Sequence, residues 1–381
     1  MSTVARAGIQ LVSVIVVVVA VAVMVAAQTN REAPVVKPSL PNPYRLVPDW
    51  PVLPATMKGP NGRKWGEVIR VHVTPNGNIW VFHRCFNDKP TGDASCVNRG
   101  DANPPILEFN PAGRLLASFG VGQFAHPHGF TVDKGGNLWT TDTNDEETVL
   151  GTPARNAQGV TMGQTVLKIS PTGKVLMTIG TSGVGGNGPY LFDRPTGVAI
   201  ASNGDIFVSD GHSRNKSNSA RIVKYSPDGK FIKTWGRMGS EPGNFRDPHD
   251  LYIGGSKAYV YVTDRQNNRI QVFDQEGKFI AAWNQFGQPS SVYVDKNDNI
   301  YVGATYQDPS RTESATGPND RAIVIGNAIT GELKYLIPDP GDLGKMTDTG
   351  SSASGIAVDD QGSVYAADVG FNNLRKYIKV Q

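Results

Sequence analysis

Two histidines occupy the same position in two copies of one repeated sequence unit. They are read as Pro127-His128-Gly129-Phe130 and Pro248-His249-Asp250-Leu251, and each opens a short apolar strand. An imidazole binds transition metals through one ring nitrogen and transfers protons near neutral pH. If the repeats close into a ring, equivalent positions meet at its centre, so we expect His128 and His249 to converge as zinc ligands. The alternative is a pair of polar side chains in a hydrated channel.

Two arginines form a second candidate group, directly after the second strand of their repeats. Arg84 follows His83 in the first copy, and Arg265 follows Asp264 in the fourth. A guanidinium stays charged and grips a carboxylate through two N–H groups. Two of them at a channel mouth therefore predict a site for the anionic end of a substrate. The alternative is that each arginine pairs with an aspartate of a neighbouring repeat.

His212 is a third candidate, because it belongs to the copy that lies between the two copies with matched histidines. It can approach the same point, either as a third metal ligand or as a general base. The alternative is that it is one polar residue of the loop that continues through residues 213–220. His126 and His83 are weaker candidates, since the repeat pattern assigns neither side chain an inward direction.

A repeat of four short strands must position these side chains. Its clearest copy, residues 194–236, has alternating strands joined by turns rich in Pro, Gly and Asp. Six such copies predict an all-β fold, a six-bladed β-propeller whose first strands line a central channel. The copies cover residues 66–120, 126–180, 194–236, 247–284, 288–339 and 352–381. At the position of His128 they carry Ile69, His128, Thr196, His249, Ser290 and Ser354.

The sixth copy stops after its third strand, residues 374–380. We expect the missing outer strand to come from the N-terminal segment near residues 44–52, which closes the ring by joining the two chain ends. The alternative, a truncated last blade with a loose N-terminus, leaves an exposed strand edge.

Composition supports a folded β protein without a nucleic-acid partner. The 381 residues are 39% hydrophobic, and their 43 glycines and 26 prolines fall between apolar runs, as turns do. A net charge of +3 comes without any basic stripe with interleaved aromatic residues, which argues against nucleic acid. We expect a monomer that acts on a small, peptide-like substrate.

The N-terminus has the pattern of an export signal. Arg6 precedes an apolar run over residues 9–27, and this run is also long enough to span a bilayer. We therefore expect residues 1–27 to be a cleaved signal peptide or a membrane anchor, and the membrane to be a partner only through this segment. Residues 28–60 form a Pro-rich linker with the ring-closing strand, and residues 61–381 form the propeller.

The two cysteines, Cys85 and Cys96, lie in one insertion of the first repeat. Because the chain carries an export signal, we expect them to form a disulfide. The alternative is two free buried thiols, and a metal-binding pair is less favoured.

The repeats over residues 66–381 resemble NHL-type propeller repeats. Within that superfamily the motifs resemble those of peptidyl-α-hydroxyglycine α-amidating lyase, the second catalytic half of peptidylglycine α-amidating monooxygenase. The matching segments, in order and by blade, are Phe82-His83-Arg84, residues 127–133, residues 207–211, Arg221-Ile222-Val223, Pro248-His249 and Asp264-Arg265.

The resemblance implies an activity and roles for residues. It implies that His128 and His249 bind zinc, that Arg84 is the catalytic arginine and that Arg265 holds the substrate carboxylate. The family splits a C-terminal α-hydroxyglycine into a peptide amide and glyoxylate, with a zinc-bound substrate hydroxyl and a nearby tyrosine. A metal-dependent carbon–nitrogen lyase is therefore the first hypothesis for function.

Three residues depart from the family pattern. Ser354 stands where the family has its third zinc histidine, and His212 stands where it has the tyrosine. We predict that His212 compensates as a ligand and takes a catalytic role. Whether the axis holds a structural calcium is left open, because Gly355 stands here where the family has the acidic residue that binds it.

The rival hypothesis for function is a non-catalytic propeller that binds a peptide, glycan or protein at its channel mouth. A third is another hydrolase or lyase that uses a different ion.

Overall fold

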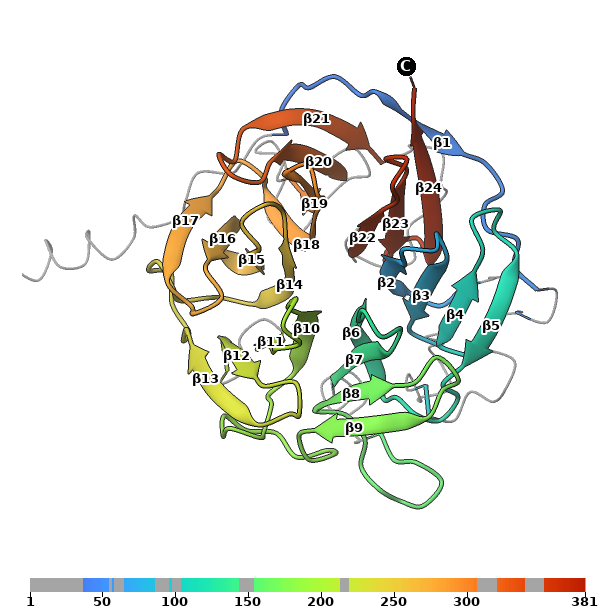
Figure 1. Cartoon of the computed structure of the whole chain (residues 1–381), viewed down its shortest axis with the longest axis vertical. Coiled ribbons are helices and arrows are strands. Elements are labelled where there is room, and N and C mark those ends of the chain that lie inside the picture. Colours follow the sequence, from blue (N-terminus) through green and yellow to red (C-terminus); the bar gives the residue numbers. More distant parts are fainter. Residues whose placement is uncertain are drawn as a thin grey trace, which may run out of the picture. The chain divides into compact units, whose positions relative to one another are not determined.

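Six four-stranded antiparallel sheets surround a central axis in the computed structural model of this chain (Figure 1). The structure describes residues 37–54, 57, 65–85, 96–97, 104–143, 154–212, 219–306, 321–339 and 353–380. These residues belong to the compact unit Val35–Gln381. Within them the only helical element is a short 3-10 turn, Arg265–Asn267. The predicted all-β, six-bladed propeller is confirmed.

Each blade is a meander whose first strand is innermost. Blade 1 contains β2 (Val68–Val73), β3 (Ile79–His83), β4 (Ile106–Phe109) and β5 (Leu115–Phe119); blade 2 contains β6 (His126–Val132), β7 (Leu138–Thr143), β8 (Thr165–Ile169) and β9 (Val175–Ile179); blade 3 contains β10 (Pro195–Ile200), β11 (Ile206–Asp210), β12 (Arg221–Tyr225) and β13 (Phe231–Trp235). Blade 4 contains β14 (Pro248–Gly254), β15 (Tyr259–Asp264), β16 (Arg269–Phe273) and β17 (Phe279–Trp283); blade 5 contains β18 (Gln288–Val294), β19 (Asn299–Thr305), β20 (Arg321–Asn327) and β21 (Leu333–Pro338); blade 6 contains β22 (Gly355–Val358), β23 (Val364–Asp368), β24 (Asn373–Lys379) and β1 (Tyr44–Val47).

The hydrophobic core lies between neighbouring blades. Trp139 of blade 2, for example, packs in one buried cluster with Val198, Val208 and Tyr225 of blade 3. The second and third strands are buried along almost their whole length, whereas the outer strands alternate. Because each sheet is covered on both faces by its neighbours, the channel itself does not have to be filled with apolar side chains.

Ring closure joins the chain ends in the predicted way. Strand β1 pairs antiparallel with β24, with Leu46 opposite Tyr377, and completes blade 6. The chain then continues to Val52, which bridges to Arg114 of blade 1. The predicted signal or anchor, residues 1–27, lies outside the described residues. In the described part of the chain no helix is long and apolar enough to cross a membrane.

A β-bulge recurs in the first strand of blades 1 to 5, always at the position matched in the repeats. In blade 3, for example, Pro195 pairs with Asp210 and Gly197 pairs with Ser209, so Thr196 is the extra residue. A bulge bends its strand and redirects one side chain. The extra residues are Ile69, Thr196, His249 and Ser290, and in blade 2 the irregularity includes His128 and Gly129.

Buried aspartates at the ends of the second strands hold the loops that enter four of the six inner strands, those of blades 2, 3, 4 and 6. Asp142 accepts the backbone N–H groups of Ala125 and His126, and Asp264 accepts that of Arg246. Asp210 and Asp368 accept equivalent backbone N–H groups. The repeated aspartate therefore has a structural role, which is to fix the backbone just before the bulge.

His83 replaces this aspartate in blade 1. Its ring is fully buried, with Nδ1 3.0 Å from the Arg84 carbonyl oxygen and Nε2 2.9 Å from that of Pro104. Burial lowers the pKa of His83 to about 4, so the neutral ring donates to one carbonyl at a time. His83 belongs to the frame of the blade.

Candidate metal centre

Three histidine side chains meet in the channel. His128 comes from β6, His249 from β14, and His212 from the segment after β11. Their ring centroids are 4.7 Å apart for His128 and His212, 4.8 Å for His128 and His249, and 5.3 Å for His212 and His249. One nitrogen from each ring lies within 4.8 Å of the others. Three imidazole nitrogens so disposed suit a zinc ion that keeps one open position.

The next blade orients each of the two matched imidazoles. Nδ1 of His128 donates to the carbonyl oxygen of Thr196 at 2.7 Å, and Nδ1 of His249 donates to that of Ser290 at 2.7 Å. Both acceptors are the bulged residues of the following blades. Since Nδ1 carries the proton, Nε2 is left with its lone pair, as in histidines that ligate metals.

Nε2 of His128 is buried and has no hydrogen-bond partner among the described residues. A buried polar atom without a partner costs free energy unless something else satisfies it. A metal ion would satisfy this atom, so the residues present fit a metal.

The electrostatics keep the buried rings neutral. Burial lowers the pKa of His128 well below its usual value, and the nearby His212, His249, Arg70 and Arg84 lower it further. Burial also lowers the pKa of His249, followed by the charge of Arg265. Neutral imidazole is the form that binds metal.

The two predicted arginines flank the histidine cluster from opposite sides. Arg84 influences the charge state of His128, whereas Arg265 influences that of His249. Nε of Arg265 lies 4.0 Å from Oδ2 of Asp247, and its side chain is 21% exposed. Both guanidinium groups are therefore near the cluster, and Arg265 keeps contact with solvent.

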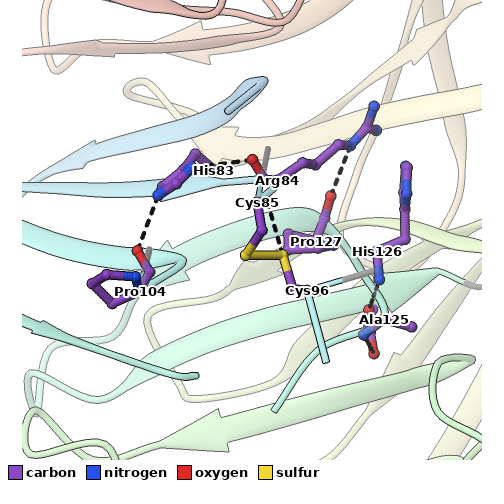
Figure 2. Close-up of a disulfide and its surroundings, with 9 residues drawn as sticks. His83, Arg84, Cys85, Cys96, Pro104, Ala125, His126 and Pro127 are labelled. Carbon is purple, nitrogen blue, oxygen red and sulfur yellow. Dashed lines mark hydrogen bonds between the residues drawn. A yellow bond between two sulfur atoms is a disulfide. The ribbon is translucent and has the colours of Figure 1, made fainter. Parts of the chain in front are cut away.

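Arg84 is fixed by two contacts. Its Nη1 lies 2.7 Å from Oε2 of Glu67. Its Nε donates to the carbonyl oxygen of Pro127 at 3.1 Å, and Figure 2 shows this second contact. Both Glu67 and Asp247 belong to the same blades as their arginines, so neither contact shown is with an aspartate of a neighbouring repeat. Sequence reasoning missed Glu67, because it lies in the turn before β2 and belongs to no motif.

The disulfide Cys85–Cys96 is confirmed, with Cα atoms 5.0 Å apart (Figure 2). The backbone N–H of Cys96 donates to the carbonyl oxygen of Ala125, just before β6. Because Cys85 directly follows Arg84, this bridge ties the arginine's strand to the loop that leads to His128. Such a bond is typical of an oxidising compartment.

The remaining candidates do not contribute a side chain to the cluster. Ser354 is fully buried, and its carbonyl oxygen accepts a hydrogen bond from Arg70. His126 is half-buried and donates its backbone N–H to Asp142. Gly355 offers no side-chain ligand, and a Cβ there would lie 2.7 Å from Cα of Arg70. With no acidic side chain here and the Arg70 guanidinium on the neighbouring Ser354 carbonyl, the position does not fit the axial calcium that the resemblance left open.

Fold and site together define a class: this protein is a six-bladed β-propeller with a cluster of three histidines in its channel. A family described as a 6-bladed beta-propeller matches residues 191–334. The architecture thus agrees with an independent sequence comparison.

Similar proteins narrow this class further. A probable peptidyl-alpha-hydroxyglycine alpha-amidating lyase of Caenorhabditis elegans is 32% identical over 221 residues, 55% of each chain. The peptidyl-glycine alpha-amidating monooxygenase of Mus musculus is 34% identical over 223 residues, which are 55% of this chain and 20% of that protein. NHL repeat-containing protein 3 of Mus musculus is 27% identical over 311 residues, 76% of this chain and 77% of that one.

The chain therefore spans about half the length of the worm relative and a fifth of the mouse monooxygenase. The resemblance to amidating lyases and NHL repeat proteins that the motifs indicated is confirmed. The similarity supports a lyase-like protein.

Proposed function

We propose that this protein is a zinc-dependent carbon–nitrogen lyase that converts peptides ending in α-hydroxyglycine into peptide amides and glyoxylate. The observation that carries the proposal is the convergence of His128, His212 and His249 beside two guanidinium groups. Similarity to proteins named as amidating lyases supports the same class of reaction.

The three imidazoles would hold the ion, and His212 would supply the ligand that Ser354 lacks. When bound, zinc acts as a Lewis acid toward a substrate oxygen. We assign His212 to metal binding first, because its ring lies within 5.3 Å of both other rings. A proton-transfer role for it is the second assignment.

The arginines would bind and polarise the substrate. Arg265, which is partly exposed, would grip the carboxylate of the hydroxyglycine through two N–H groups. Arg84, held by Glu67, would stabilise negative charge that develops on the hydroxyl oxygen. The reaction breaks one C–N bond, moves the hydroxyl proton to the leaving amide nitrogen and consumes no water. The chain's task is therefore orientation and proton transfer.

We further propose that the protein works as a monomer outside the cytoplasm. The disulfide next to Arg84 supports an oxidising compartment. Residues 1–27 would act as the signal peptide or anchor that brings the propeller there.

Metal analysis of the purified protein is the first test. We expect about one zinc per chain and a marked fall in the His128→Ala, His249→Ala double variant. The matched control is Ser290→Ala, which changes a buried side chain at the same ring position and leaves the carbonyl that orients His249. A wild-type protein without bound transition metal would sink the lyase assignment.

Release of glyoxylate from an α-hydroxyglycine peptide is the second test. Activity that is lost in Arg84→Ala while zinc stays bound identifies the amidating reaction. Bound zinc without glyoxylate release instead indicates another metal-dependent reaction at the same cluster.

A non-catalytic binding propeller is the second candidate. It is favoured by the similarity to NHL repeat-containing protein 3, which extends over 76% of this chain, against 55% to 61% for proteins named as amidating lyases. Under this alternative the channel mouth binds a peptide, glycan or protein. Saturable binding of an unmodified peptide that is lost in Arg265→Ala, together with a protein free of zinc, would favour it.

A further inference from the structure

The side chain of Arg70 lies on the axis, next to the histidine cluster. The proposed lyase reaction does not use this charged group. Arg70 follows the bulged residue Ile69 in β2, and only 4% of it is exposed. Its strand reads Val-Ile-Arg-Val-His-Val, so Arg70 is the one charged residue in a mostly apolar strand. A fully charged side chain is rarely buried without a set of partners.

The partners of Arg70 are backbone oxygens of the ring itself. Nη1 donates to the carbonyl oxygen of Ile69 at 3.0 Å and to that of Ser354, and Nη2 donates to that of His249 at 3.2 Å. These acceptors come from blades 1, 6 and 4, all at the matched position. The guanidinium therefore links three blades through three equivalent backbone groups.

A carboxylate completes this oxygen cage. Oδ1 of Asp250 lies 3.3 Å from Nη2 of Arg70, and both side chains are buried. Oδ2 of the same aspartate accepts the backbone N–H of Val292 in blade 5. Three carbonyl oxygens and one carboxylate are the kind of ligands that a hard divalent cation such as calcium takes.

Gly355 makes room for this arrangement. A Cβ at this position would lie 2.7 Å from Cα of Arg70 and 2.8 Å from the carbonyl oxygen of Ile69. The glycine thus lets blade 6 approach the backbone of β2 closely, and it excludes an acidic side chain. The glycine leaves the space that the close approach of blade 6 to β2 requires, and the arginine supplies the positive charge.

We propose that Arg70 is a built-in axial cation, whose guanidinium takes the structural place of a divalent ion, so that this propeller needs no calcium. The charge neutralises Asp250 and satisfies ring carbonyls at the centre of the fold. One of these carbonyls belongs to His249, so the same group also positions a residue of the histidine cluster.

Removal of the arginine should uncover a cation site. In Arg70→Ala the three carbonyls and Asp250 lose their donor, and we expect the melting temperature to fall by roughly 5 to 10 °C. Millimolar calcium chloride should restore at least half of that loss, and calorimetric titration should detect one calcium per chain. All proteins in this test carry His128→Ala and His249→Ala, so that the histidine cluster takes no ion. With Arg70 in place, this background should neither bind calcium nor gain stability from it.

Asp250→Asn provides the matched control, because it keeps the volume and removes the only charged oxygen of the cage. In the Arg70→Ala, Asp250→Asn variant, calcium should no longer raise the melting temperature. If Arg70→Ala loses stability only because it leaves a cavity, calcium will not raise the melting temperature of Arg70→Ala or of Arg70→Ala, Asp250→Asn. That result would overturn the proposal. Calcium binding by the wild-type cage would overturn it as well.

If Arg70→Ala does not fold, Arg70→Lys and Arg70→Met separate charge from volume. We expect the lysine variant to retain more thermal stability than the methionine variant, because it keeps a cation beside Asp250. Equal stability of the two would contradict a role for the charge.

Discussion

The two halves of the channel ring use the same backbone position for different chemistry. In blades 2 to 4, two bulged residues are histidines, and a third histidine joins them from the loop after β11. In blades 5, 6 and 1 the matched residues are Ser290, Ser354 and Ile69, which offer carbonyl oxygens to a ring nitrogen or to Arg70. Only blades 2 to 4, the nitrogen half, add imidazole side chains, whereas blades 5, 6 and 1, the oxygen half, add carbonyl oxygens alone; Thr196 and His249 offer their carbonyl oxygens as well.

The difference shows that the bulge and the side chain have separate tasks. The bulge places a backbone carbonyl beside the next blade, where Thr196 and Ser290 each accept an imidazole Nδ1. The side chain at the same point then decides whether a blade adds a ligand. The ring can therefore gain or lose metal chemistry by substitution without a change of fold, because the second-strand aspartates fix the backbone independently.

Loss of one matched histidine should break the nitrogen half most strongly. His249→Ala removes one of the three proposed ligands, and since structural zinc sites supply about 10 to 16 kcal/mol from four ligands, we expect zinc affinity to fall by roughly a hundredfold or more. Ser290→Ala, at the matched position of the oxygen half, should change it by less than about threefold. Competition with a chromogenic chelator measures both. Equal losses in the two variants would contradict the division of the ring.

The two arginines should separate into catalytic and binding effects. Arg84→Ala should lower kcat for glyoxylate release by roughly a hundredfold, as the loss of one charge-stabilising donor does, with zinc content unchanged. Arg265→Ala should act mainly on KM, because it removes a grip on the substrate carboxylate. Steady-state kinetics with zinc analysis distinguishes them. A common fall in kcat would place both guanidiniums at the reacting atoms.

His212 should have a smaller effect on the metal than the matched pair. It lies outside the inner strands and is only half-buried, so water can take its place. We expect His212→Ala to weaken zinc binding by about tenfold, in the range seen when groups that support a metal site are removed. His212→Gln keeps a polar side chain without an imidazole and serves as the control. Unchanged affinity in His212→Ala would remove His212 from the ligand set and leave it the proton-transfer role.

Asp142 tests the frame behind the histidine half. Burial raises its pKa to about 7 from 3.8, despite the backbone N–H groups of Ala125 and His126 that favour the charged form. Between about pH 4 and 7, the folded state therefore keeps a proton on Asp142 that the unfolded state has already released. This contribution to stability is complete below pH 4 and is lost as the pH rises through 7, by at most about 1.4 kcal/mol per pH unit.

Asp142→Asn should therefore flatten the decline in unfolding free energy between pH 4 and 7. It should also cost about 1 to 3 kcal/mol, because its amide nitrogen cannot accept the backbone N–H that a carboxylate oxygen accepts. Urea denaturation at several pH values measures both effects. Blade 5, which has Ala304 at the matched position, shows that a blade folds without this carboxylate. An unchanged pH profile in the variant would mean that Asp142 stays ionised throughout.

Much of the architecture was predictable, since it depends on local patterns. Alternating strands, Gly-containing turns and six copies of one unit predict the propeller, and the short sixth copy predicts its closure by the N-terminal strand. The same register places His128 and His249 at matched points, and the spacing of Cys85 and Cys96, in a chain with the pattern of an export signal, predicts their bond. Arg70 could have been noticed as the one charge in the apolar strand β2.

The sequence by itself determined the repeat, and with it the residue type at each ring position. Only the tertiary structure decided which groups meet across the channel. Arg70 contacts backbone oxygens of residues 179 and 284 positions away, and His128 is oriented by a residue 68 positions away. Local periodicity carries no information about such contacts, because they depend on the twist and tilt of six blades closing around one axis. The hydrogen bonds around Arg70, and those that orient the two imidazole Nδ1 atoms, therefore form only in the closed ring.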